Sequence, residues 1–146
     1  MWSSNQKTEM IESKKNFLKL IGKNQEDLKV VSAYLQDSIV ATKDIVFLKK
    51  NRTFIMIASR FMWEDVERGV FRKNKRIRCA LKFEDIQQVK SKNIDQKNKD
   101  LTLELLAIDL IKNKDRFEIN LIFNNNSFLT LSTEIVEVTL EDQNKI

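Results

Sequence analysis

From residue 39 onward, apolar and polar residues alternate with a period of two, the pattern of β-strands that bury one face. The alternating segments are rich in Ile, Val, Phe and Thr, residues that favour strands. The predicted strands are residues 39–48, 53–61, 76–83, 86–91, 101–111, 116–123 and 127–133, with a shorter candidate at 17–21. A chain with this pattern must fold largely as a β-sheet.

Two segments alternate most cleanly. Ile77, Cys79, Leu81 and Phe83 alternate with Arg76, Arg78, Ala80 and Lys82, and Phe117, Ile119, Leu121 and Phe123 alternate with Arg116, Glu118, Asn120 and Ile122. We therefore predict Cys79 to be a small core residue. Arg76 and Arg78 should point to one side of their strand.

The turns between these strands must form without proline and with only two glycines. Residues 49–52, 112–115 and 124–126 are short enough for hairpins, and Asn tolerates the left-handed conformation in place of glycine. A meander of consecutive antiparallel strands is expected. Within 101–111 the apolar residues change from one face to the other, which predicts a bulge or a passage between two sheet walls.

One α-helix is predicted, at about residues 25–36. Asn24 can accept a hydrogen bond from the backbone N–H of Asp27 as an N-cap. Leu28, Val31 and Leu35 recur at helical spacing, so one face should pack inward. The expected fold is α+β, with one N-terminal amphipathic helix on a mainly antiparallel β-meander that forms a barrel or two sheets.

The ends of the chain differ in character. Residues 1–15 are polar and carry both signs of charge, so a disordered tail followed by a single domain at 16–146 is expected. In residues 134–146, Val136, Val138 and Leu140 alternate, which favours a last strand over a short closing helix.

Composition excludes several kinds of chemistry. The chain has no histidine, one cysteine and two glycines, so the usual zinc and haem sites, histidine-dependent triads, CxxC pairs and phosphate-binding glycine loops are absent. No apolar run is long enough for a membrane span or a signal peptide. We expect a cytoplasmic protein with no cofactor, no metal, no membrane contact and Cys79 as a free thiol. The formal net charge of +5 reflects mostly a Lys-rich background.

Several segments resemble the bacterial DUF2948 family, found chiefly in alphaproteobacteria. The matching segments are LKLI at 18–21, EDLKVVSAYLQD at 26–37, RFMWE at 60–64, RCALKF at 78–83 and LELLAI at 103–108. SAYLQD at 32–37 and RFMWE are the most specific. The resemblance spans about residues 16–140, and it implies a domain with no assigned activity.

The first candidate site is a basic cluster beside aromatic residues Phe61, Trp63 and Phe71. It consists of Arg68, Arg72, Lys73, Lys75, Arg76 and Arg78. Clustered cations attract phosphates, and aromatic side chains can stack on bases, as in single-stranded nucleic-acid binding. The sequence favours another interpretation, in which Arg76, Arg78 and Lys82 are the solvated face of an edge strand.

The second candidate is the family-like motif Gln36, Asp37, Arg60, Trp63 and Glu64, which we interpret as structural. Asp37 ends a helix, where a carboxylate opposes the helix dipole. It therefore needs a compensating contact, from Arg60, Arg52 or backbone N–H groups of the next strand. Trp63 should pack at the end of the core, with its indole N–H bound to a carbonyl or carboxylate.

These patterns favour a non-enzymatic binding or accessory module that acts through a protein partner or self-association. The alternative is RNA or DNA binding through the basic loop at 72–78, and an enzyme of unknown reaction comes third. No residue is assigned a catalytic role.

Overall fold

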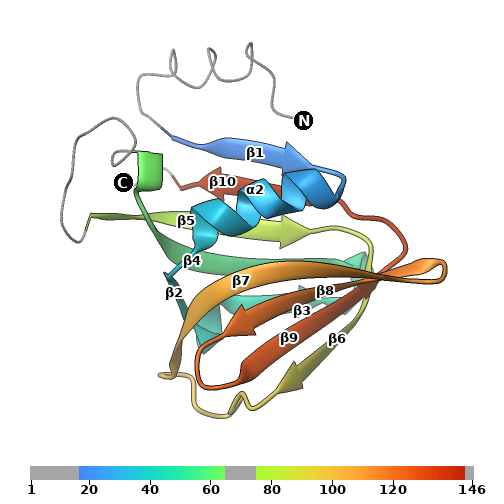
Figure 1. Cartoon of the computed structure of the whole chain (residues 1–146). Helices are drawn as coiled ribbons and strands as arrows, with labels where there is room; N and C mark the ends of the chain where they lie inside the picture. The colour runs from blue at the N-terminus through green and yellow to red at the C-terminus, as the bar shows by residue number, and fades with distance from the viewer. Residues whose placement is uncertain (1–16, 65–74, 144–146) are drawn as a thin grey trace.

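The computed structural model describes residues 17–64 and 75–143. In these residues the chain forms a ten-stranded antiparallel sheet with one α-helix (Figure 1). The strands are β1 (Lys19–Gly22), β2 (Ser38–Ala41), β3 (Ile45–Leu48), β4 (Thr53–Phe61), β5 (Arg76–Phe83), β6 (Ile86–Lys92), β7 (Thr102–Asn113), β8 (Arg116–Phe123), β9 (Ser127–Thr133) and β10 (Val138–Asp142). The helix is α2 (Gln25–Leu35), and η1 (Thr42–Asp44) and η2 (Lys49–Asn51) are single 3₁₀ turns. The expected tail at 1–15 lies outside the described residues.

Most predicted strands are confirmed, several to the residue, and the segment after residue 134 forms strand β10. The predicted strand at 39–48 is in fact two strands, β2 and β3, separated by η1. Thr42 explains the break, since its N–H donates to the Leu101 carbonyl oxygen at 3.0 Å and its hydroxyl to that of Asn98 at 2.9 Å. With ten strands and one helix in the described residues, the fold is closer to all-β than the α+β class predicted.

Strand order is β1-β10-β5-β4-β2-β7-β8-β9-β6, with β3 also paired to β4. The hairpins β3–β4, β7–β8 and β8–β9 are confirmed, and Arg52, Lys114, Asn125 and Asn126 in their turns have positive φ. The simple meander is wrong, because β5 and β6, β6 and β7, and β9 and β10 are not paired. A tight corner with Asp85 at φ 59° separates the buried Phe83 and Ile86, so β5 pairs with β10 while β6 pairs with β9.

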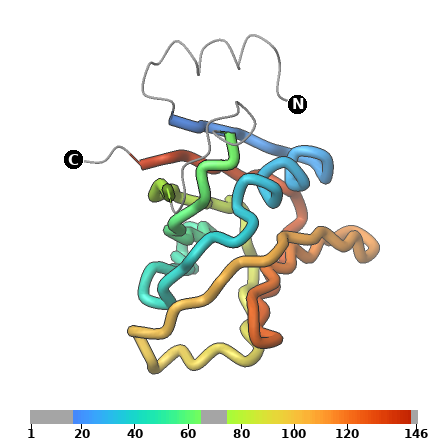
Figure 2. Tube along the Cα trace, turned by 60° about the vertical axis from the view of Figure 1, so that its left-hand side comes forward, coloured from blue at the N-terminus to red at the C-terminus, as the bar shows by residue number. Residues whose placement is uncertain are grey.

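The sheet curls around the core and stays open in the described residues, because β1 pairs only with β10 and β6 only with β9. Figure 2 shows β1 and β10 at one end of the molecule and the β6–β7 connection at the other. The predicted irregularity in residues 101–111 is confirmed as a bulge. Leu105 pairs with Phe123 and Ala107 with Ile122, which leaves Leu106 between them.

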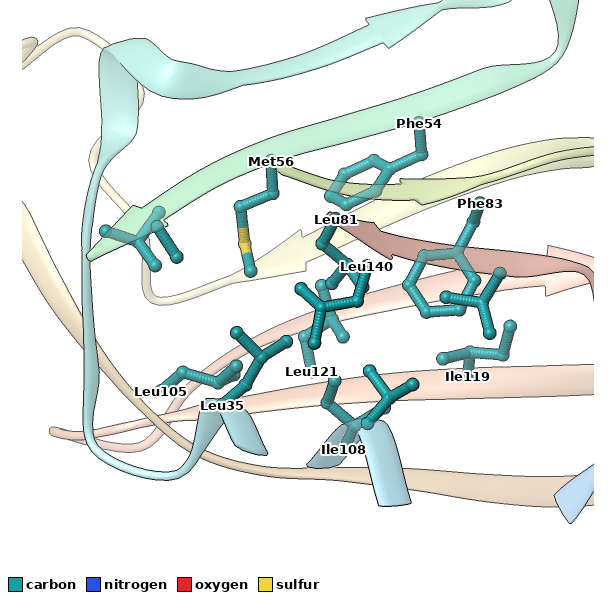
Figure 3. Close-up of a cluster of buried hydrophobic side chains, with 14 of the residues drawn as sticks. Leu35, Phe54, Met56, Leu81, Phe83, Leu105, Ile108, Ile119, Leu121 and Leu140 are labelled. Carbon is teal, nitrogen blue, oxygen red and sulfur yellow. The ribbon is translucent and has the colours of Figure 1, made fainter. Parts of the chain in front are cut away.

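The core lies between the two curled parts of the sheet. Figure 3 shows Phe54 and Met56 of β4, Leu81 of β5, Leu121 of β8 and Leu140 of β10 converging there. Helix α2 buries Leu28, Val31 and Leu35, and it makes most of its contacts with β7. The Asn24 side chain accepts from the Asp27 N–H at 2.8 Å, the predicted N-cap. With eleven residues α2 is too short to cross a bilayer, and no other helix of the described residues is long and apolar enough to do so.

Candidate functional site

Four segments that are distant in sequence meet where α2 ends and β4 leaves the sheet. They are Gln36–Asp37 after α2, Arg60–Glu64 at the end of β4, Arg76 at the start of β5 and Asp142 at the end of β10. Since side chains alternate along a strand, Arg60 points into the protein while its neighbour Phe61 points outward. The motif residues therefore fall into an inner group around Arg60 and an outer group around Phe61.

The inner group is a buried ion-pair network. Arg60 Nε donates to Asp142 Oδ1 at 2.8 Å, and Nη2 donates to Asp142 Oδ2 at 2.8 Å. Nη1 and Nη2 donate to the two Glu64 carboxylate oxygens at 2.9 and 2.6 Å, and Nη1 also donates to the Phe61 carbonyl oxygen at 3.0 Å. These five bonds match the five N–H donors of a guanidinium.

Arg60 has the largest side chain among the fully buried residues that the structure describes. Burial alone would lower the pKa of Arg60, but its hydrogen bonds to Asp142 and Glu64 outweigh that effect and raise the pKa. The guanidinium also lies over the Tyr34 ring, 5.6 Å from its centroid. Arg60 is thus a permanent cation with every donor satisfied, which suits an anchor better than a reacting group.

Asp142 extends this network to the first strand. Its Oδ2 also accepts the Leu18 N–H at 2.8 Å, and its own N–H donates to the Leu18 carbonyl oxygen at 2.8 Å. The Arg60–Asp142 pair therefore fastens β1 and β10 to β4. Asp142 was not predicted from the sequence, because its strand ends in acidic residues and nothing local distinguishes a buried carboxylate from an exposed one.

The outer group is a stack of one cation on two aromatic rings. The Arg76 guanidinium lies over the Phe61 ring at 5.4 Å, and Phe61 stacks on Trp63 with centroids 5.0 Å apart. Arg76 Nη1 donates to the carbonyl oxygens of Asp37 and Ser59, both at 3.0 Å. Trp63 Nε1 donates to the Gln36 carbonyl oxygen at 3.3 Å. The outer group thereby holds the turn after α2 against the ends of β4 and β5.

Asp37 is tied down through its backbone. Its φ is 66°, and its N–H donates to the Leu105 carbonyl oxygen at 2.8 Å. Of the partners considered for its carboxylate, Arg60 binds Asp142 and Glu64, and Arg52 pairs with Asp85 at 3.5 Å. The predicted contacts of Asp37 with Arg60 and Arg52 are therefore wrong, because both cations bind other carboxylates.

The six-residue basic cluster is only partly within the described residues. Arg68, Arg72 and Lys73 lie outside them, as does Phe71. Arg76 and Arg78 do share one face of β5, but β5 lies between β10 and β4. The interpretation of these arginines as part of an edge strand is therefore wrong. On this face Arg76 is half-buried in the stack, and Arg78 is exposed.

A family model for DUF2948, described as a protein of unknown function, matches residues 18–146. The chain belongs to the DUF2948 family. No curated protein and no solved structure matches it. In this DUF2948 chain, the two segments most specific to the resemblance, 32–37 and 60–64, contribute side chains or backbone groups to the junction just described.

Apolar side chains continue from the outer group across the sheet of this DUF2948 protein. We call this surface the outer face; it comprises Ile39 of β2, Val46 and Leu48 of β3, Ile55, Ile57 and Ser59 of β4, and Arg78, Ala80 and Lys82 of β5. The strand register places Val46 beside Ile55 and Ile57 beside Ala80. Ile39, Val46 and Leu48 keep 42%, 43% and 42% of their surface exposed.

The remaining candidate for chemistry is Cys79, which is fully buried in the core. Burial raises the pKa of the Cys79 thiol to about 12. A nucleophilic cysteine needs the opposite shift, because the thiolate is the reactive form. Within the described residues, no three acidic or cysteine side chains gather as a metal site would need.

Proposed function

We propose that this protein is a non-enzymatic binding module whose outer face docks an acidic, partly apolar segment of a different protein. The observation that carries the proposal is the set of exposed aliphatic side chains on this face. Isolated exposed apolar residues are ordinary, but neighbouring ones mark interaction surfaces. Ile39 lies on β2, and Val46 and Leu48 lie on β3. Both strands pair with β4.

The aromatic and arginine side chains at one end of the face support the same function. Protein interfaces are enriched in Trp, Phe and Arg, and their energetic hot spots in Trp and Arg. Phe61, Trp63 and Arg76 are half-buried in this stack. Hydrogen bonds to backbone carbonyl groups hold Trp63 and Arg76 in place, and Phe61 is packed between them, so little side-chain entropy remains to be lost on binding.

Charge determines the kind of partner. The outer face carries Arg78 and Lys82, with Arg76 beside them. Lys82 pairs with Glu84 at 3.1 Å, and Glu141 of β10 and Glu104 of β7 border the face opposite Ala80 and Ile39. Two copies of this face would bring like charges together, which is unfavourable at an interface. A different protein with acidic side chains around an apolar centre fits the surface better than a second copy.

Nucleic acid is the competing anionic partner. Binding of single strands needs aromatic faces on which bases stack. Here Trp63 stacks on the Phe61 ring and the Arg76 guanidinium also lies over that ring, so Phe61 is already engaged. Ile39 and Val46 have apolar side chains, which cannot bind a phosphate backbone. These contacts support a protein partner over RNA or DNA.

The test compares two double variants with equal changes in charge and polarity. Ile39→Asp with Val46→Asp alters the outer face, and Ile111→Asp with Ile135→Asp alters apolar residues of similar exposure elsewhere. A companion should co-purify with the wild type from native lysate in stoichiometric amount. After identification, the purified companion should bind the wild type and the control, and binding to the outer-face variant should weaken by about 30-fold or more, a loss of roughly 2 kcal/mol.

Three results would overturn this proposal. The first is a monomeric wild type with no stoichiometric companion, and the second is a companion that binds the outer-face variant normally. The third is a homodimer that the outer-face variant abolishes, since that result identifies self-association. Nucleic-acid binding that falls steeply with salt, and is lost when Arg72, Lys73, Lys75 and Arg76 are neutralised together, would favour the alternative.

A further inference from the structure

A cavity of about 470 Å³ opens between β3 and β6, away from the outer face. Strand β3 pairs only with β4, and β6 pairs only with β9, so each presents an unpaired edge in the described residues. The segment 93–101 forms the third side. Figure 2 shows this segment, in yellow to orange, as a wide loop at the end of the molecule opposite β1. The cavity thus lies where the curled sheet fails to close.

The cavity has an apolar interior. Ile45 and Phe47 of β3, Val89 of β6 and Ile94 line its walls, and the buried Phe54 and Leu129 lie deeper. The first four are only partly buried although they pack on the core. They therefore leave apolar surface in contact with water that a ligand can cover.

The polar residues that line the cavity are neutral or positively charged. They are Thr42, Lys43, Ser91, Gln96 and Lys99, and no carboxylate is among the lining residues that the structure describes. Both lysines are exposed, and a lysine can lay its methylene chain on apolar surface while its ammonium group stays in water. The cavity therefore combines an apolar interior with two cations at its mouth.

Hydrogen bonds hold this mouth in shape before any ligand binds. Thr42 is bonded to both Asn98 and Leu101, which fixes η1 against the segment 93–101. Gln96 Nε2 donates to the Ser91 hydroxyl oxygen at 2.6 Å and joins the same segment to β6. Small-molecule sites are characteristically preformed, mostly apolar and about 300–1,000 Å³ in volume, with few polar groups that orient the ligand.

We propose that this cavity binds a small anionic amphiphile. The apolar part of the ligand covers Ile45, Phe47 and Val89, and its anionic group lies between Lys43 and Lys99. This site is separate from the outer face, because Val46 and Leu48 point to the opposite side of β3 from Ile45 and Phe47.

An extended peptide added to one of the free edges is the main competitor. Strand β3 offers only four residues for pairing. A backbone at that edge would also leave the deeper apolar surface at Phe54 and Leu129 uncovered. The depth and the charge of the cavity favour a chain-like or ring-like apolar group with one anionic head.

The test uses dodecanoate below its micelle concentration, with dodecanol and dodecyltrimethylammonium as probes of the head group. Calorimetry on the full chain should detect saturable binding of dodecanoate, weaker binding of dodecanol and the weakest binding of the cationic probe. Replacing both cavity lysines, Lys43→Ala with Lys99→Ala, should weaken dodecanoate binding about tenfold, the sum of two exposed charge contacts. The matched control, Lys90→Ala with Lys92→Ala, removes two exposed lysines of β6 that do not line the cavity and should leave binding unchanged.

A steric variant and a spectroscopic measurement locate the ligand independently. Ser91→Trp at the exposed rim should block binding while lowering the unfolding temperature only slightly, because it removes only the exposed hydrogen bond from Gln96. Methyl resonances of Ile45, Val89 and Ile94 should shift with dodecanoate, and those of the distant Ile21 should stay fixed.

The proposal is overturned if dodecanoate does not bind, or if it binds with methyl shifts elsewhere. Equal affinity for the three probes, or equal effects of the two lysine pairs, would also overturn it. None of these results bears on the outer face, whose variants lie on other side chains.

Discussion

Two arginines at the same level of the sheet show how differently one residue type can be used. Arg60 points inward from β4, and Arg76 lies on the outer face of β5, paired across the strands with Phe61. The inner guanidinium is fully buried with two carboxylates, whereas the outer one rests on an aromatic ring and binds backbone carbonyl groups.

The difference follows from the cost of removing a charge from water. A buried charge must have every hydrogen-bonding group satisfied, and losing one partner leaves the other buried and uncompensated. A half-exposed cation keeps some of its hydration, so its contacts contribute less. The inner network should therefore govern stability, and the outer group should be free to serve recognition.

Substituting the inner arginine should have the largest effect. Arg60→Ala leaves Asp142 buried without its cation and should lower the free energy of unfolding by about 3–5 kcal/mol, measured by urea denaturation. Arg78→Ala, on the exposed face of β5, is the matched control and should change it by less than about 0.5 kcal/mol. The double variant Arg60→Met with Asp142→Leu should recover part of the loss, since both charges are gone. A loss below about 1 kcal/mol for Arg60→Ala would contradict the comparison.

The next largest effect concerns Cys79, which pairs across the sheet with Asp142 behind the same network. Its pKa is raised by burial from about 9 to about 12, so the folded state keeps a proton that the unfolded state loses. The contribution of the Cys79 thiol to the free energy of unfolding is fully present below pH 9. It should fall by about 1.4 kcal/mol per pH unit between about pH 9 and 12.

The measurement for Cys79 is denaturant unfolding across this pH range, for the wild type and Cys79→Ala. Every other ionisable group is common to both proteins, so the difference between the two curves isolates the thiol. Parallel stability curves for the two proteins would mean that folding does not raise the pKa of Cys79, and that the thiol behind Arg60 is more accessible to water than its burial indicates.

Substituting the outer arginine should cost less than substituting the inner one. Arg76→Ala removes two hydrogen bonds to carbonyl oxygens and the contact with Phe61, a loss of about 1–2 kcal/mol in the free energy of unfolding. A double-mutant cycle with Phe61→Leu should give a coupling energy of about 0.5–1 kcal/mol. A coupling energy of zero would mean that the stack has no energetic role.

The smallest stability effect is expected at Trp63. Trp63→Ala should lower the free energy of unfolding by about 1 kcal/mol, because a half-buried ring loses its stacking on Phe61. Trp63→Phe keeps an aromatic ring on Phe61 and removes only the hydrogen bond to the Gln36 carbonyl oxygen. It should lower the free energy of unfolding by less than about 0.5 kcal/mol. Thermal unfolding of both variants tests the order. A loss at Trp63→Ala as large as at Arg60→Ala would abolish the distinction between the two groups.

The strands could be predicted from the sequence because their signal is local. Ile77, Cys79, Leu81 and Phe83 alternate strictly, and the structure buries the last three of them completely. The N-cap Asn24 and the bulge near Leu106 were predictable for the same reason: each depends on neighbours a few residues away. The break at Thr42 was not, because it depends on hydrogen bonds to Asn98 and Leu101.

The candidate site was predicted in part. Gln36, Arg60, Trp63 and Glu64 were singled out as a motif, and the structure brings them to one junction. Asp142 was missed although it is the buried partner of Arg60, and the two lie 82 residues apart in sequence. The cavity between β3 and β6 was missed as well, since it arises from the failure of the curled sheet to close.

The sequence by itself determined that this DUF2948 chain is built mainly of strands, where most of them begin and end, and which side of the two most regular strands, β5 and β8, faces the core. Periodicity decides these features because alternation along a strand is a property of adjacent residues. Only the tertiary structure decided that β5 is a central strand, that β6 pairs with β9 and that Arg60 is neutralised by Asp142. Those outcomes depend on which distant segments bury their apolar faces together, and a linear pattern does not record the choice of partner.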